Sequence, residues 1–374
     1  MLDADVIIIG GGLAGLVSAI HLSQAGKSVI VIEKDGYPHH KVCGEYISNE
    51  VLPYLTALGA NPAVLNPTEI TKFEMSTPKS NLIHADLPLG GFGLSRFTFD
   101  HFLQQRAKQS GAIINQNTVL DIVYKDEIFT VTTKDKTYKC RVAIGAYGKR
   151  SALDLKLKRP FIKEKSNWLA VKAHYTGNFP DNLVALHHFK GGYCGVSKVE
   201  HQLINICYLV NYTSFKKYKN IKEHQEKVLY QNPHLSAILQ NSTMHFEAPL
   251  SISQISFEQK ECVKNHILMV GDTAGLIHPL CGNGMGMAIH AAQIASTLIL
   301  KFFNGEITSQ ENLEKAYTTE WQQNFKSRLK TGHLLSSLLR MEKLSDFLIN
   351  CMTKFPALLP KIIKRTHGKP ITIS

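Results

Sequence analysis

Residues 6–33 begin with Val6-Ile7-Ile8-Ile9-Gly10-Gly11-Gly12-Leu13-Ala14-Gly15 and end with Val29-Ile30-Val31-Ile32-Glu33. The first four residues form a short, apolar and β-branched run, which is typical of a buried parallel strand. Apolar side chains at helical spacing follow the glycines, and Gly26 ends the predicted helix before the second strand. This stretch therefore predicts a strand–helix–strand unit in a parallel sheet.

The glycines of this stretch fit the pattern G-x-G-x-x-G at Gly10, Gly12 and Gly15. The first glycine allows a tight turn, the second lets the backbone approach a pyrophosphate, and the third lets helix and strand pack closely. The helix N-terminus offers free N–H groups and a positive dipole end to phosphates. Glu33 ends the second strand, where a carboxylate can accept hydrogen bonds from a ribose. We therefore predict a dinucleotide site, the alternative being a glycine-rich turn in an ordinary α/β unit.

Length and composition indicate a soluble protein large enough for two domains. The chain has 374 residues, and 44% of them are hydrophobic. No apolar run reaches the length needed to span a bilayer, and Leu2-Asp3-Ala4-Asp5 lacks the basic start of a signal peptide. The seven cysteines show neither C-x-x-C pairing nor zinc-like spacing. We therefore expect reduced thiols, no metal site and a cytoplasmic location.

Positive charge is concentrated near the C-terminus. The net charge of the chain is +12, and residues 326–374 contain ten Lys or Arg against two acidic residues. No nucleic-acid-binding motif accompanies this basic segment, so nucleic acid is not an expected partner. An anionic ligand or an anionic membrane surface is favoured, which would place the protein peripherally on the inner membrane surface.

The order of predicted elements indicates two interleaved domains. A cofactor domain is expected at residues 1–72, 94–155 and 257–305, and a substrate domain at residues 73–93 and 156–256. Strand-like runs dominate residues 168–255, which predicts a mostly antiparallel sheet. A β-meander is expected over residues 113–144, a flexible turn at residues 90–93, and a basic helical segment at residues 306–374.

Further motifs follow the glycine turn in a fixed order. Ala143-Ile144-Gly145-Ala146-Tyr147-Gly148-Lys149-Arg150-Ser151 is similar to G-A-D-G-x-x-S. Gly271-Asp272-Thr273-Ala274-Gly275, followed by Pro279-Leu280-Cys281-Gly282-Asn283-Gly284-Met285, is similar to G-D-A-A-x-x-x-x-P-x-x-G-x-G. With the glycine turn, they resemble the FAD-dependent oxidoreductases of the p-hydroxybenzoate-hydroxylase type, over residues 1 to about 305. The resemblance implies an α/β fold: a Rossmann-like FAD-binding domain interleaved with an antiparallel-sheet substrate domain, plus C-terminal helices.

The third motif also has a physical interpretation of its own. Asp272 follows a buried strand, so its carboxylate can bond a ribityl hydroxyl. Gly282, Gly284 and Gly286 permit the backbone to approach a flat ring. Free N–H groups at the start of the next helix can stabilise negative charge on a reduced flavin. The alternative is a helix-capping Asp followed by a glycine-rich turn.

The resemblance implies FAD as cofactor and NAD(P)H as reductant, and it places Arg96 near the FAD. Cys43 and His278 are the candidate catalytic residues. The candidate cofactor-binding residues are Gly10, Gly12, Leu13, Ala14, Gly15, Glu33, Lys34, Lys41, Cys43, Gly44, Arg96, Leu120, Ala146, Gly148, Gly271, Asp272, Pro279, Gly282, Asn283, Gly284 and Met285.

Within that superfamily, Lys41-Val42-Cys43-Gly44-Glu45 and the loop at 279–286 resemble the geranylgeranyl-reductase-like branch and its relatives near the flavin halogenases. Gly192-Tyr193-Cys194-Gly195-Val196 lies where those reductases carry Y-x-W-x-F-P, but it lacks the Trp and the F-P. Neither tryptophan of the chain lies in the G-W-x-W-x-I-P signature of halogenases. The hydroxylases have Asp at the position of Tyr147, which leaves the mode of NAD(P)H binding open.

Two kinds of reaction, both on a lipophilic substrate, fit these residues. We expect the second sheet to roof a cavity lined by Val171, Leu186, Val196 and Ile206. The favoured function is an NAD(P)H-dependent monooxygenase that hydroxylates an aromatic, polyketide or isoprenoid-like molecule. The alternative is a geranylgeranyl-reductase-like enzyme that saturates a carbon–carbon double bond, with Cys43 supplying the proton. A flavin-less binding protein is the remaining alternative, and Tyr147 is its only support.

An apolar stripe at helical spacing runs through the basic C-terminal segment. We expect it to pack on the protein's own core, the alternatives being a membrane-facing helix or a lid over the cavity. Its members are Leu334, Leu338, Met341, Leu344, Leu348, Met352 and Phe355.

Overall fold

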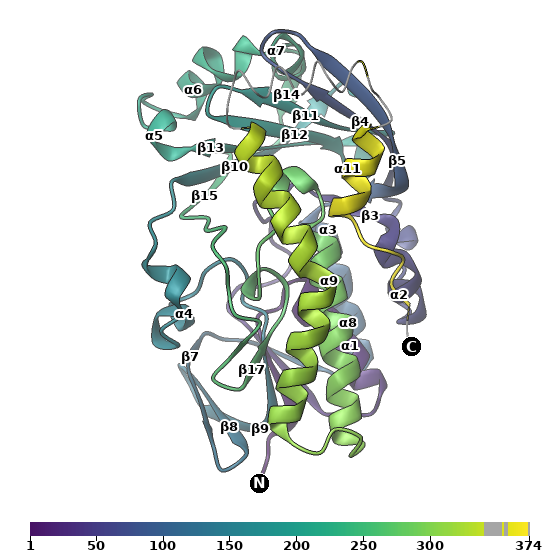
Figure 1. The fold of residues 1–374 in the computed structure, drawn as a ribbon, viewed down its shortest axis with the longest axis vertical. Helices are drawn as coiled ribbons and strands as arrows, with labels where there is room; N and C mark the ends of the chain where they lie inside the picture. Colours follow the sequence, from purple (N-terminus) through teal and green to yellow (C-terminus); the bar gives the residue numbers. More distant parts are fainter. Residues whose placement is uncertain (340–353, 355–357, 373–374) are drawn as a thin grey trace.

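The computed structural model describes residues 1–339, 354 and 358–372 (Figure 1). The chain forms two sheets, one at each end of the molecule, with the long helices α8 and α9 running between them (Figure 1). The described α-helices are α1 (Leu13–Gln24), α2 (Leu52–Ala57), α3 (Arg96–Gln109), α4 (Ala152–Lys156), α5 (Tyr212–Phe215), α6 (Ile221–Lys227), α7 (Pro233–Gln240), α8 (Gly284–Phe303), α9 (Gln310–Leu339) and α11 (Leu358–Thr366).

The first sheet has a parallel centre, in which β1 pairs with β2 and β9, β2 with β6, and β9 with β17. This arrangement confirms the predicted α/β class. The β-meander prediction was wrong at its start, because β6 returns from α3 and joins β2 in parallel, so that only β7, β8 and β9 form the meander. The strands are β1 (Ala4–Ile9), β2 (Val29–Glu33), β6 (Ile113–Gln116), β7 (Val119–Lys125), β8 (Ile128–Thr133), β9 (Thr137–Gly145), β16 (Val263–Lys264) and β17 (Ile267–Met269).

The second sheet is largely antiparallel, as predicted, with one parallel pair between β4 and β11. Two of its strands draw on residues before position 73, the expected start of the substrate domain. The strands are β3 (Tyr46–Ser48), β4 (Thr68–Ser76), β5 (Leu82–Gly93), β10 (Trp168–Gly177), β11 (Leu183–Phe189), β12 (Gly192–Lys198), β13 (Ile204–Asn211), β14 (Ser242–Met244) and β15 (Leu250–Ser253).

The glycine-rich residues 90–93 are a buried strand end and not the flexible turn that the sequence predicted. Gly91 and Gly93 pair with β3. A Cβ atom on Gly93 would lie 1.8 Å from the carbonyl oxygen of Lys198, and one on Gly91 would lie 2.6 Å from that of Ile47. These glycines therefore serve close backbone packing.

The second sheet has an outer face and an inner face, and the predicted cavity lining mixes the two. Val171, Val196 and Ile206 pack on the outer side with residues around α7, such as Leu235. Leu186 belongs to the inner cluster, together with Tyr193 and Leu209. The prediction was wrong for the first three because a period of two tells which residues share a face, but not which face meets the other domain.

A buried charge cluster connects the two sheets. The Glu45 carboxylate accepts hydrogen bonds from Lys172 Nζ and His174 Nε2, each at 2.7 Å, and from the Arg96 backbone N–H at 2.8 Å. Lys172 and His174 lie on β10 of the second sheet, whereas Arg96 begins α3 on the cofactor side. Burial alone would raise the pKa of Glu45, but Lys172 and His174 hold it below its ordinary value.

In the described part of the chain, α8 alone is long and apolar enough to cross a membrane by length and composition. This finding corrects the expectation that no apolar run reaches that length. Within the protein, 56% of its most apolar window is buried, and it packs against α1 and α9. These contacts are those of a core helix.

The predicted apolar stripe lies mostly outside the described residues, which include only Leu334 and Leu338 of its members. Leu334 is 60% exposed, and Leu338 is partly buried. Further along, α11 buries Leu359, Ile363 and Thr366.

Replacing Lys172 with Met should lower the free energy of unfolding by about 3–5 kcal/mol, because Glu45 would keep a buried charge without its main partner. Urea unfolding of the two proteins measures this difference. The matched control Lys72→Met alters an exposed lysine in the same sheet and should leave stability nearly unchanged. Equal stability of Lys172→Met and the unmodified protein would contradict the role of the cluster.

Candidate cofactor site

Of the three glycines that fit the pattern G-x-G-x-x-G, two are tightly packed and one is open. A Cβ atom on Gly10, whose φ is +104°, would lie 2.3 Å from the Ala146 carbonyl oxygen, and one on Gly15 would lie 2.0 Å from that of Gly10. Gly12 differs, because a Cβ there meets only Arg96 Nη2 at 3.5 Å and Lys41 Nζ at 3.9 Å. The surface over Gly12 is therefore open and bordered by two cations.

The electrostatics of this surface suit an anion. Arg96 binds Asp100 through Nε and Nη2, both at 2.7 Å, and Lys41 Nζ lies 2.8 Å from the same carboxylate. Burial would raise the pKa of Asp100, but Arg96 and Lys41 keep it below its ordinary value. Arg96 and Lys41 are the two groups that border the open surface over Gly12. With the free N–H groups and positive dipole end of the α1 N-terminus, these cations favour a pyrophosphate there.

The Glu33 side chain is hydrogen-bonded to the backbone of the glycine turn. Its carboxylate accepts hydrogen bonds from the backbone N–H groups of Gly11 at 2.5 Å and Asp35 at 3.1 Å. A carboxylate has further acceptor sites, so a ribose hydroxyl can still bind. The candidates Lys34 and Leu120 both have exposed side chains, and Lys34 Nζ lies 3.8 Å from Asp35 Oδ2.

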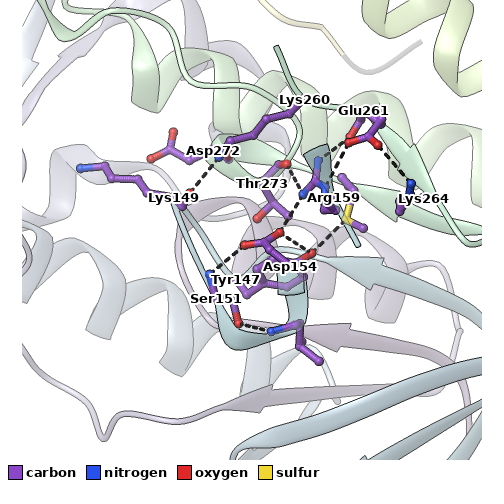
Figure 2. Close-up of polar contacts among 12 residues, drawn as sticks. Tyr147, Lys149, Ser151, Asp154, Arg159, Lys260, Glu261, Lys264, Asp272 and Thr273 are labelled. Atoms are coloured by element: carbon purple, nitrogen blue, oxygen red, sulfur yellow. Dashed lines mark hydrogen bonds and ion pairs between the residues drawn. The ribbon is translucent and has the colours of Figure 1, made fainter. Parts of the chain in front are cut away.

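The second and third motifs lie against each other and against α1. Gly148 N–H donates to Thr273 Oγ1 at 2.8 Å, and that hydroxyl donates back to the Gly148 carbonyl at 3.2 Å. A Cβ on Gly271 would lie 3.2 Å from Ala14 Cβ. Figure 2 shows the Asp272 carboxylate pointing away from Arg159 and outside the contacts drawn there. It is thus available to a ligand hydroxyl.

Tyr147 is held within this arrangement. Its hydroxyl donates to Asp154 Oδ1 at 3.2 Å, and the other Asp154 oxygen accepts the Ser151 N–H at 2.8 Å (Figure 2). Burial is the main cause that raises the pKa of Tyr147. The tyrosine therefore has a structural partner of its own.

The start of α8 contains glycines with different roles. A Cβ on Gly284 would meet only Ile277, at 3.9 Å, which leaves room for a ring to approach. Gly286 is a packing glycine, because a Cβ there would lie 2.2 Å from Asn283 Oδ1, so the expectation that it faces the ring was wrong. Asn283 is fully buried and donates to the Thr366 carbonyl at 2.9 Å.

Cys43 lies where the two domains meet. Its thiol is partly buried and 3.7 Å from the sulfur of Met285, at the start of α8. Asn205 Nδ2, from β13, donates to the carbonyls of Gly44 at 2.8 Å and Cys43 at 3.3 Å, and Lys149 Nζ donates to the Val42 carbonyl at 3.2 Å. The loop at residues 42–44 is therefore held by hydrogen bonds from both domains.

His278 and Cys281 are both buried. The His278 ring lies 4.6 Å from the Phe257 ring and 5.8 Å from the Tyr193 ring, and it lines a cavity of about 260 Å³ with Trp168 and His333. Burial raises the pKa of Cys281 to about 12, which makes it an unreactive thiol.

These features converge at the carboxyl ends of the parallel strands β1, β2, β9 and β17, where open α/β sheets bind their ligands. The open surface at Gly12, its cations, Glu33 and the free Asp272 carboxylate fit the phosphates, ribose and ribityl chain of FAD. The fold and the site define a dinucleotide-binding protein.

Residues 3–328 match the family described as FAD binding domain, so the chain belongs to that family and is an FAD-dependent oxidoreductase. A digeranylgeranylglycerophospholipid reductase from Methanococcus vannielii is 25% identical, over 93% of this chain and 89% of its own. A menaquinone reductase from Mycobacterium tuberculosis is 23% identical, over 79% and 76%. Conditioned medium factor receptor 1 from Dictyostelium discoideum is 24% identical, over 90% and 70%.

Solved structures share the fold. The flavin-dependent brominase Bmp2 superposes with a TM-score of 0.80 at 17% identity, over 97% of this chain and 93% of that one. A geranylgeranyl bacteriochlorophyll reductase-like protein from Thermoplasma acidophilum has a TM-score of 0.73 at 18% identity, over 99% and 93%. The mixed α/β FAD-binding fold with a largely antiparallel second sheet is confirmed.

Sequence reasoning missed the polar residues that position the site from outside the motifs. Lys172, His174 and Asn205 lie on strands of the second sheet, whereas Arg159 and Lys260 lie outside the strands and contact the second and third motifs. The sequence does carry a signal for Lys172 and His174. Polar residues two apart in an otherwise apolar strand lie on the same face, which indicates a shared polar partner there.

Gly12→Ala should weaken FAD binding at least tenfold and leave the melting temperature of the FAD-free protein unchanged. The added methyl group fits among the protein atoms but occupies the surface where the pyrophosphate approaches. Gly15→Ala is the matched control, and it should lower the melting temperature because its methyl group collides with the Gly10 backbone. Flavin fluorescence titration and thermal unfolding measure both effects, and unchanged FAD affinity in Gly12→Ala would contradict the assignment.

Proposed function

We propose that this protein is an FAD-dependent reductase that saturates a carbon–carbon double bond in a lipophilic, isoprenoid-bearing substrate, with NAD(P)H as reductant. The observation that carries this proposal is the position of Cys43, a partly buried thiol held by both domains beside the start of α8. Similarity to relatives named as menaquinone and digeranylgeranylglycerophospholipid reductases supports it. These relatives favour the alternative over the monooxygenase that the sequence favoured.

The cofactor and this chain contribute different parts of the reaction, the hydride and the proton. FAD, when bound, supplies hydride-transfer chemistry. Saturating a double bond also needs a proton at the second carbon, and the Cys43 thiol can donate it. Asn205 fixes the backbone carbonyls of Cys43 and Gly44, which limits where the thiol can point. Lys149 fixes the preceding carbonyl from the cofactor side.

The substrate class follows from the inner face of the second sheet. Leu186, Tyr193 and Leu209 form an apolar cluster there with Leu276, which precedes His278. The α11 helix adds Leu359 to the same cluster. An apolar chain can replace such contacts without leaving polar groups unpaired, which favours an isoprenoid tail.

Oxygenation is the second candidate, and Gly195 is the observation that favours it. A Cβ there would meet its nearest atoms, Cys207 O and Leu186 Cδ2, at 3.6 and 3.7 Å, which is ordinary contact. The strand thus has room for a Cβ atom at this position, which the glycine leaves unfilled. An aromatic or polyketide substrate could use that room.

Anaerobic reduction of the enzyme, addition of menaquinone and geranylgeranyl lipids, and later admission of oxygen-18 gas distinguishes the candidates. We expect a product that gains two hydrogens before oxygen enters. Cys43→Ala should slow this reaction about 10²–10⁴-fold, as loss of a general acid does. Cys262→Ala, which alters a buried thiol beside Thr318, should not. A product that gains labelled oxygen only after gas admission would contradict the proposal and support the monooxygenase.

We also propose that α11 brings the enzyme to an anionic membrane surface, on the cytoplasmic side, where such lipids are found. Its apolar residues Leu359 and Ile363 are buried in the protein, while Lys361, Lys364 and Arg365 are exposed. The helix therefore offers a basic face for contact with lipid headgroups.

Replacing Lys361, Lys364 and Arg365 together with Gln should weaken binding to phosphatidylglycerol vesicles at least tenfold at low salt. The control variant carries Gln at Lys216, Lys217 and Lys219, which are exposed, and it should sediment as the unmodified protein does. Their neighbours Phe215 and Tyr218 pack against the outer cluster of the second sheet, whereas α11 packs against the inner cluster. Vesicle sedimentation measures both. Equal recovery of all three proteins in the supernatant would contradict the membrane proposal.

A further inference from the structure

Two buried cations outside the motifs join the second motif to the third. Arg159 is fully buried, and its Nη1 donates to Asp154 Oδ1 at 3.1 Å and to the Thr273 carbonyl at 2.9 Å. Lys260 Nζ donates to the carbonyls of Lys149 and Asp272, both at 2.8 Å. Figure 2 shows these contacts converging from both sides on the two motifs.

The partners of Lys260 are unusual for a buried ammonium. The residue is 5% exposed, and its hydrogen bonds go to backbone carbonyls and not to a carboxylate. It also lies 4.4 Å from the centre of the Phe161 ring. Burial of a charge costs free energy unless its surroundings compensate. The hydrogen bonds of Lys260 fix two backbone positions, the carbonyls of Lys149 and Asp272.

Those two positions matter because of their side chains. The Asp272 carboxylate is the group that fits a ribityl hydroxyl, and the Lys149 ammonium holds the Val42 carbonyl next to Cys43. In Figure 2 both side chains extend away from Arg159, on the side of the cluster opposite to it. A shift of either carbonyl would therefore move a group that faces the flavin end of the site.

We propose that Lys260 is a positioning residue for the flavin half of FAD, holding Asp272 and Lys149 in register through their backbone carbonyls. Arg159 and the Thr273 hydroxyl complete the connection between the motifs. The described contacts of Lys260 do not include the glycine turn, which faces the pyrophosphate. The ADP half and the flavin half of the cofactor are thus held by separable parts of the chain.

Separate titrations of the full-length, FAD-depleted protein with FAD and with ADP test this inference, by calorimetry. Lys260→Met should weaken FAD binding at least tenfold and leave ADP binding unchanged, and Lys260→Arg should restore FAD binding because a guanidinium can reach both carbonyls. The visible circular dichroism of the bound flavin should change in Lys260→Met only.

Thr273→Val is the second variant, since it removes the hydroxyl bridge to Gly148 without leaving a buried charge, and it decides the matter if Lys260→Met does not fold. It should also weaken FAD binding and spare ADP binding. Unchanged FAD affinity, or equal losses of FAD and ADP affinity, would overturn the proposal, since equal losses indicate a general structural defect. The test needs no catalytic turnover, so it is independent of the proposed reductase activity.

Discussion

The buried carboxylate of Glu45 is the constraint on which the joining of the two domains depends. It accepts hydrogen bonds from Lys172 and His174 of the second sheet and from the first N–H of α3 on the cofactor side. Glu45 is fully buried, so removing Lys172 would leave its carboxylate without its main partner, at a large cost in stability. Cys43 lies two residues earlier in the same loop and is therefore held where both domains contribute.

A second buried carboxylate, that of Glu50, ties the C-terminal segment to the rest of the protein. Glu50 accepts the Gly368 N–H at 2.5 Å and lies 3.4 Å from Arg328 Nη1 of α9. Its neighbour Asn283, at the start of α8, binds the Thr366 carbonyl. Because Thr366 is the last residue of α11, the helix that completes the apolar cluster is tied to the same end of α8 that fits the flavin ring.

The local pattern predicted most of the fold, because glycine turns and apolar strands carry their own signals. The motifs at Gly10, Gly148 and Asp272 were predicted as parts of one site, and the structure brings them together. Patterns alone could not tell that Val171 faces outward, since alternation does not fix the orientation of a sheet. Isolated residues such as Arg159 and Lys260 gave no signal either, because their roles depend on distant backbone atoms that only the fold brings near.

Titration of the FAD-depleted protein with FAD, followed by quenching of flavin fluorescence, tests whether the three motifs together hold the cofactor. We expect a yellow complex that saturates at one FAD per chain. Failure to quench, or no saturation with excess FAD, would contradict it and favour a protein that keeps the fold without the cofactor.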